Sequence, residues 1–172
     1  MGGKWADLTG DEKREERFQK WLSPDVQFSS PVAAKLYTER VTRFIDTIQL
    51  KVPDRVPCIL PTGLFPALYA GINLRTAIYD YDELRRAWFK FIHEFDMDTY
   101  SGPGTVLPGR VFEKLDFKQY LWPGHGLAEN IASYQYVERE YMQADEYDAL
   151  IDDPSDFWMR VYVPRIFGAL DS

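Results

Sequence analysis

Two segments of the chain repeat one spacing of apolar residues, and this spacing restricts the local structures that they can adopt. In residues 32–49 the apolar side chains recur at i, i+4, i+7, i+8 and i+11, and residues 84–95 repeat the series. Such a series covers one face of an α-helix. We therefore predict two amphipathic helices. Their buried faces carry Tyr37, Val41, Phe44, Ile45 and Ile48 in the first helix and Leu84, Trp88, Phe91, Ile92 and Phe95 in the second.

A short apolar run separates the two predicted helices. The run "VPCILP", residues 56–61, is typical of a strand that is buried on both faces. The segment "DMDTYSG", residues 96–102, follows the second helix and favours another strand, which leads into a loop rich in Gly and Pro. Because strand, helix and strand alternate, we predict a β/α architecture with parallel strands. Cys58 lies in the first run without a basic neighbour, so we expect a buried thiol rather than a nucleophile.

The remaining segments give weaker signals. Thr9 followed by Glu12 fits a capping box, which predicts a polar helix over residues 9–22. Strand-like stretches flank "PGHG" in residues 117–138, so we predict an irregular hairpin there. A last helix is predicted to begin at Pro154 and to be interrupted near Pro164.

The negative charge of the chain is concentrated in one segment. Residues 138–156 contain eight acidic residues and one basic residue, which equals the net charge of −7 of the whole chain. The segment lacks the ligand spacing and the Gly of an EF-hand loop. Carboxylates at a helix N-terminus bind free N–H groups, so we expect Asp145, Glu146 and Asp153 to begin and cap helices.

Composition excludes several classes of protein. The calculated pI near 4.9 argues against a nucleic-acid-binding protein, which normally carries a basic face. A single cysteine excludes an internal disulfide and a Cys-based zinc site within this chain. The sequence shows no apolar leader and no apolar run of membrane-spanning length, so the expected location is the cytoplasm.

Candidate site residues follow from position, because the sequence contains no HExxH, GxSxG, Walker or GxGxxG motif. In β/α barrels the loops after the strands build the active site. The loops after residues 61 and 100 supply four candidates, and "WPGHG" adds a histidine that is flanked by glycines. The predicted substrate-pocket residues are Thr62, Phe65, Tyr100, Ser101 and His125. For each of them a purely structural role is the alternative. The second histidine, His93, is expected at the boundary of its helix.

Two stretches resemble the uroporphyrinogen decarboxylase superfamily. "ERVTRFIDTIQLKVPDRVPCILP" is similar to the helix that leads into the first barrel strand of that family, and "YVEREYMQADEYDALIDDPSDFWMRVYVPR" is similar to a later region of its uncharacterised and methyltransferase-type members. The resemblance covers residues 32–168. It implies the fold class α/β, as the N-terminal portion of a (β/α)8 TIM barrel, with residues 1–30 as a helical extension and residues 31–172 as the partial barrel domain.

The superfamily has two known kinds of activity, and the sequence departs from one of them. Decarboxylases bind substrate carboxylates through arginines after the first strand, whereas "PTGLFPALYAGI" has no arginine before Arg75. They also carry an Asp after the second strand, where this chain has "TYSGPGTV". The resemblance therefore favours the methyltransferase branch, in which zinc and a corrinoid protein serve methyl transfer to thiols. Its zinc ligands lie in the later half of the barrel, so no metal site is expected within this chain.

The number of residues sets the last expectation. A complete barrel needs about 250 residues, and this chain has 172. We expect a C-terminal half, a second polypeptide or another copy of the chain to complete the barrel, and we expect the isolated chain to be inactive. The alternatives are a non-catalytic subunit that binds a partner through its aromatic surface, and a divergent uroporphyrinogen decarboxylase.

Overall fold

The structure is a computed structural model that describes residues 5–171. The first four residues of the predicted N-terminal extension and the last residue of the predicted barrel part lie outside this range. The chain is mixed α/β and divides into two compact units. The first unit comprises the chain up to Leu60 together with Met97–Tyr100, and the second comprises Pro61–Asp96 and the chain from Ser101 on. Among the described residues, no helix combines the length and the apolar character needed to cross a membrane.

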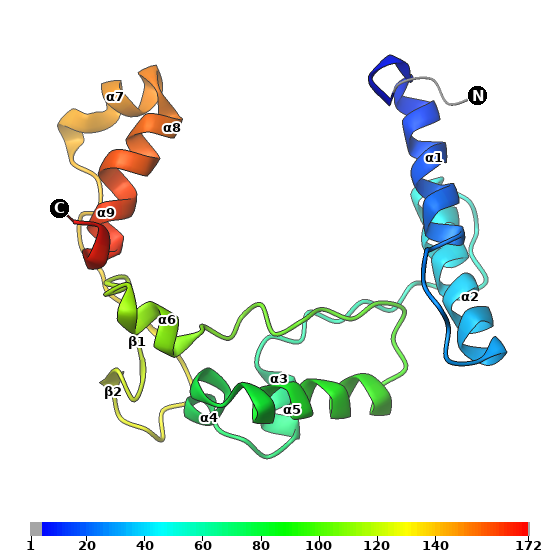
Figure 1. The fold of residues 1–172 in the computed structure, drawn as a ribbon, viewed down its shortest axis with the longest axis horizontal. Coiled ribbons are helices and arrows are strands. Elements are labelled where there is room, and N and C mark those ends of the chain that lie inside the picture. The colour runs from blue at the N-terminus through cyan, green and yellow to red at the C-terminus, as the bar shows by residue number, and fades with distance from the viewer. Residues whose placement is uncertain (1–4, 172) are drawn as a thin grey trace. The chain divides into compact units, whose positions relative to one another are not determined.

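Two helices make up most of the first unit, and Figure 1 shows them side by side. A short 3-10 turn, η1 (Trp5–Asp7), precedes α1 (Gly10–Leu22), and α2 (Pro31–Ile48) follows. The predicted capping box is confirmed, since the Glu12 N–H donates to Thr9 Oγ1 and the Thr9 N–H donates to Glu12 Oε2. The Tyr37 hydroxyl donates to the Trp21 carbonyl at 2.8 Å, so the N-terminal extension packs on the second helix.

The second unit begins with three helices that pack on one another: α3 (Phe65–Tyr69), α4 (Leu74–Tyr79) and α5 (Tyr81–Glu94). The helix predicted from the second apolar series is confirmed, with Asp80 as its N-cap, 3.0 Å from the Glu83 N–H. Its apolar face is buried at Leu84, Trp88 and Phe91. The small side chains of α3, α4 and α5 allow this close packing, and the buried cluster contains Ala67, Ala77, Leu84, Ala87 and Trp88.

A small sheet and a second cluster follow. After α6 (Gly109–Lys114), the strands β1 (Tyr120–Pro123), β2 (Gly126–Leu127) and β3 (Gln135–Tyr136) form a sheet in the order β2-β1-β3. Strands around "PGHG" are therefore confirmed, although the antiparallel partner of β1 is β3. The segment after "PGHG" pairs with β1 in parallel register. The core beneath the sheet contains Leu74, Ile78, Phe117, Trp122, Tyr141 and Ile166.

The acidic segment forms helix starts, as predicted. The elements after the sheet are η2 (Ala144–Glu146), α7 (Tyr147–Asp152), α8 (Pro154–Phe157), the π-helix η3 (Trp158–Tyr162), α9 (Val163–Ile166) and η4 (Gly168–Leu170). Asp153 accepts from the N–H groups of Ser155 and Asp156, which confirms its capping role. Pro164 has no N–H to donate, and the helix widens to a π-turn just before it.

The apolar run at residues 56–61 does not form the predicted buried strand. Within the described residues it has one ladder position, an isolated parallel bridge between Ile59 and Thr99. Val56 is 83% exposed and Ile59 is 57% exposed. Cys58 is also exposed, so the prediction of a buried thiol is wrong. A continuous apolar run indicates the burial that a covered parallel sheet provides, and this structure supplies no such cover on the run.

Leu50 is strained and exposed at the end of α2, which leads to a prediction about stability. Its φ is +58°, and 93% of its surface is exposed. The left-handed conformation costs a non-glycine residue roughly 1–2 kcal/mol, whereas glycine costs roughly 0.5–1 kcal/mol in chain entropy. Leu50→Gly should therefore stabilise the protein by about 0.5–1 kcal/mol in urea unfolding followed by circular dichroism. Leu50→Ala keeps the strain and is the control. Equal stability of the two variants would contradict the prediction.

Candidate functional site

Arg43, a buried arginine of α2, binds two carboxylates. It is 6% exposed. Its Nε and Nη2 donate to the two oxygens of Asp54 at 2.7 and 2.6 Å, and its Nη1 donates to Asp98 Oδ1. Within α2, the Thr47 hydroxyl donates to the Arg43 carbonyl at 2.8 Å. The guanidinium fork suits this bidentate arrangement, which a lysine could not make.

Asp98 is the centre of the group that we call the Asp98 clasp, which consists of Arg43, Asp54, Arg55 and Asp98. The Asp98 side chain is fully buried. Arg55 donates to both of its oxygens at 2.7 and 2.8 Å, and the Cys58 N–H donates to Oδ2 at 2.6 Å. Two guanidiniums and two carboxylates give the clasp no net charge, which satisfies the condition for burying ions.

The environment of Asp98 holds it in the charged form. Burial alone would oppose ionisation, but the Cys58 N–H and the guanidiniums of Arg43 and Arg55 outweigh it, so the pKa of Asp98 lies below its ordinary value. The hydrogen bond from Arg43 likewise lowers the pKa of Asp54. Both carboxylates are thus acceptors at neutral pH. Neither is prepared to act as a general acid.

The clasp joins segments that are far apart in the sequence. It links α2, the approach to the apolar run and the segment around Asp98, which lies some 40 residues further on. The Asp98 N–H donates to the Cys58 carbonyl at 3.0 Å next to the Ile59–Thr99 bridge. The predicted parallel pairing of the two segments is therefore confirmed at this one position. The clasp fixes their register, because side chains and backbone of both segments are bound together.

An open groove of about 450 Å³ lies beside the clasp within the first unit. Charged and hydroxyl side chains of α2 form most of its wall, and Asp54 adds the opposite side. Its lining comprises Lys35, Thr38, Glu39, Thr42, Arg43, Asp46 and Asp54. The groove can accept a polar group through hydrogen bonds. Its carboxylates and cations are mixed, which gives it no clear preference for one sign of charge.

Two predicted site residues share a turn at the start of the second unit. Thr62 is 7% exposed, and its carbonyl accepts from the Phe65 N–H at 2.9 Å. The Phe65 ring contacts Tyr69, Phe91 and Phe95 at centroid distances of 5.7–5.9 Å. The structure thus gives both residues roles in local packing, while Phe65 stays 42% exposed.

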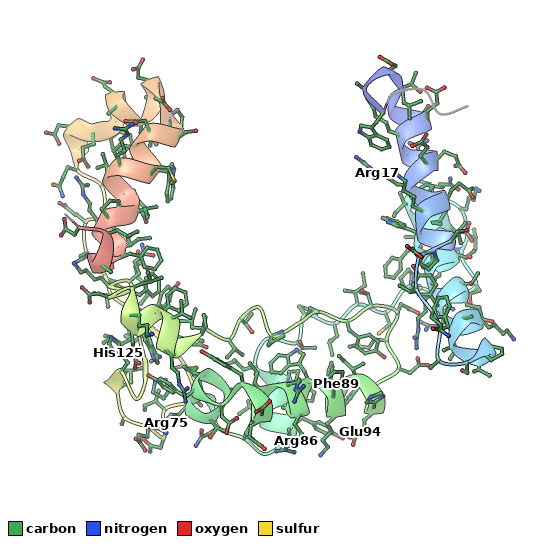
Figure 2. All side chains as sticks on the ribbon, viewed as in Figure 1. Arg17, Arg75, Arg86, Phe89, Glu94 and His125 are labelled. Atoms are coloured by element: carbon green, nitrogen blue, oxygen red, sulfur yellow. The ribbon has the colours of Figure 1, made fainter. Side chains whose placement is uncertain are left out.

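The other predicted residues lie in other segments of the chain. The Tyr100 hydroxyl accepts from the Met97 N–H at 3.1 Å, so Tyr100 supports the segment around Asp98 in the first unit. Ser101 is exposed at the beginning of a second-unit segment. His125, which is labelled in Figure 2, lies in the turn between β1 and β2. Its imidazole contacts Trp122 and Glu113.

The sequence analysis did not predict the Asp98 clasp, although the sequence contains two indications of it. Asp98 is an acid inside a predicted strand, and an acid that becomes buried there needs a cation. Arg43 is a cation between the apolar positions of the first helix. Arg43 and Asp98 are 55 residues apart in the sequence, so neither residue by itself predicts the ion pair.

In the described part, residues 5–171, no three His, Cys, Asp or Glu side chains are grouped to hold a metal ion.

Comparison with known proteins adds no relative. No family model, curated protein or solved structure matches the chain. The superfamily resemblance accordingly rests on the quoted residues alone.

Removal of the buried carboxylate tests the clasp. Asp98→Asn removes the carboxylate that Arg55 binds and one of the two that Arg43 binds, and such a loss at a buried pair costs about 3–5 kcal/mol of unfolding free energy. Asp54→Asn is the matched control. Because the Asp54 side chain is 63% exposed, water replaces much of its interaction and the loss should be smaller. Chemical unfolding measures both. A loss for Asp98→Asn no larger than that for Asp54→Asn would contradict the central role of Asp98.

The clasp also predicts a dependence on pH. Since the folded-state pKa of Asp98 is depressed, its contribution is complete above the unfolded value of about 3.9 and disappears as the pH falls through the folded value. The stability difference between wild type and Asp98→Asn should therefore be constant from pH 7 to about pH 5 and should shrink below about pH 4. Unfolding curves at several pH values give this difference, and a difference that persists undiminished at pH 2 would contradict the assignment.

Proposed function

We propose that the chain is the N-terminal part of a uroporphyrinogen decarboxylase-superfamily enzyme, in the branch that transfers methyl groups. Further β/α units, in the same polypeptide or in a partner chain, would complete the barrel and the active site. The observation that carries the proposal is the parallel contact of residues 58–59 with residues 98–99, across a helical crossover and next to the Asp98 clasp.

Parallel pairing of this kind needs cover on both faces. Parallel sheets occur almost only where helices or further strands bury them. Here Val56, Ile59 and Leu60 remain 83%, 57% and 45% exposed. Each such side chain gains roughly 1.5–3 kcal/mol on full burial. Further strands and helices of a barrel would provide that burial, and this gain supports a completing segment or chain.

Methyl transfer fits the described residues better than decarboxylation does. The superfamily decarboxylases hold substrate carboxylates with arginines that follow the first strand. In this chain the first arginine after the corresponding segment, residues 56–61, is Arg75. Arg75 already pairs with Glu129 at 3.1 Å and lies over the Tyr79 ring. In the proposed enzyme this chain supplies the first two strand segments, which the Asp98 clasp holds together. The completing part supplies the groups that bind the methyl donor and the thiol.

A non-catalytic subunit is the second candidate. It is favoured by the clasp itself, because all four of its charged groups are paired with one another and none is left for acid–base chemistry. In that case the exposed apolar run would bind a partner chain without any transfer reaction.

Methyl transfer from methylcobalamin to a thiol such as coenzyme M tests the proposal. The recombinant 172-residue chain should be inactive, and protein isolated from the source organism with an antibody to this chain should be active. Its intact mass should exceed 20.1 kDa, or a second polypeptide should co-purify.

Three results separate the candidates. Methyl transfer by the isolated chain at an ordinary enzymatic rate would overturn the proposal that further β/α units are needed to complete the active site. A co-purifying partner without methyl transfer would support the non-catalytic subunit. A native protein of 20.1 kDa that has neither partner nor activity would contradict both candidates.

A further inference from the structure

The turn that carries His125 is tightly constrained. The Trp122 N–H donates to the His125 carbonyl at 2.9 Å, and the His125 N–H donates to the Trp122 carbonyl at 2.8 Å. Gly124 and Gly126 on either side have φ values of +87° and +80°. A Cβ at Gly126 would also lie 2.7 Å from Leu121 Cδ2. These constraints hold the backbone of His125 in one position.

The imidazole of His125 is positioned as well. It stacks on the Trp122 indole with a centroid distance of 4.3 Å and an interplanar angle of 18°. Trp122 is 0% exposed, so it provides a rigid support. The His125 side chain is 41% exposed, so a ligand can approach it from solvent.

A carboxylate lies on the Nδ1 side of the imidazole. Glu113 Oε1, from α6, is 3.9 Å from His125 Nδ1. The Tyr79 hydroxyl donates to the same oxygen, and the Trp122 Nε1–H donates to the Tyr79 oxygen at 2.9 Å. Burial and the hydrogen bond to Glu113 raise the pKa of Tyr79, which keeps its hydroxyl a donor. Tyr79, Glu113, Trp122 and His125 therefore form a closed set, the His125 cluster.

This arrangement resembles the way in which enzymes orient a catalytic histidine. A carboxylate beside Nδ1 favours the tautomer with hydrogen on Nδ1 and leaves the lone pair on Nε2. A third group, here the Tyr79 hydroxyl, fixes the carboxylate. The 3.9 Å separation is longer than a hydrogen bond, and such contacts are often long without substrate and shorten when it binds.

We propose that His125 is a general base for a small thiol or hydroxyl compound and that Glu113 is its positioning residue. The S–H or O–H of the substrate gives its proton to Nε2, which yields the thiolate or alkoxide and an imidazolium whose Nδ1–H donates to Glu113. The proton later leaves Nε2 for the product or for water. The inference rests on contacts within the second unit, whereas the proposed function rests on residues 58–59 and 98–99 of the first unit, so either can fail without the other.

The second histidine of the chain is an internal control for reactivity. His93 lies on α5 and stacks on Phe89, with no carboxylate described at its imidazole among residues 5–171. Diethyl pyrocarbonate acylates unprotonated imidazole: a ring nitrogen forms a bond to one carbonyl carbon, the ring loses its proton, and ethanol and carbon dioxide leave. Peptide mass spectrometry follows the two sites separately.

Diethyl pyrocarbonate should acylate His125 roughly tenfold faster than His93. This ratio is smaller than the ~10²–10⁴-fold rate gain that a general base gives with an oriented substrate, because the reagent is not oriented by the protein. Glu113→Gln should reduce the rate of His125 to that of His93 and leave His93 unchanged. Near-ultraviolet circular dichroism of the buried Trp122 shows whether each variant keeps its fold. Equal rates of the two histidines in the wild type would overturn the proposal.

Hydrolysis of p-nitrophenyl acetate is a second measurement, in which water supplies the hydroxyl that His125 deprotonates. His125→Gln should lose the activity and regain part of it with added imidazole, whereas His93→Gln should keep it. Glu113→Gln should lower kcat and leave KM unchanged, as expected for a group that acts through His125. An active His125→Gln variant, or one that imidazole does not rescue, would contradict the assignment.

Discussion

The buried carboxylate of Asp98 is the interaction on which the first unit depends. It joins Arg43 of α2, Arg55 and the backbone of Cys58, so one side chain holds together three segments that the sequence keeps apart. An unpaired charge in this position would be expensive, and the neutral set of two arginines and two aspartates removes that cost. The clasp therefore specifies which segments meet and in which register, more than it adds stability.

The Asp98 clasp and the His125 cluster differ in what they leave accessible. In the Asp98 clasp every charged group is paired, and the central carboxylate is fully buried. The His125 cluster is built on an equally rigid base, the buried Trp122, but its imidazole and carboxylate are partly exposed. The first arrangement suits a structural role and the second suits chemistry.

Exposed apolar residues from the end of α2 into the apolar run at 56–61 give the first unit its unusual surface. Leu50, Val52 and Val56 are each more than 80% exposed, within seven consecutive residues. Leu50 also adopts a conformation in which glycine would be more stable. Strain and apolar exposure together are typical of a surface retained for contact rather than for the stability of the isolated chain. Both candidate functions use this surface, as the first strand of a larger barrel or as a binding segment.

Local patterns in the sequence were sufficient for the helices and their caps. The series of apolar residues located α2 and α5, and Thr9 and Asp153 marked helix starts, because these features depend on residues two to four positions apart. The apolar run at 56–61 was misjudged since its burial depends on neighbours, which a single segment does not encode. His125 was selected from its flanking glycines alone, without its partners.

By itself, then, the sequence determined α1, α2, α5 and the helix start at Pro154, the strands around "PGHG" and how the acidic segment uses its charge. Only the tertiary structure decided that Asp98 meets Arg43 and Arg55, that His125 meets Glu113 and Trp122, that Thr62 and Phe65 share a turn, and that the Tyr100 hydroxyl binds the Met97 backbone. The reason is physical. Helical periodicity and capping are properties of neighbouring residues, whereas a buried ion pair or a stacked histidine forms only after the chain has brought distant residues to within a few ångströms.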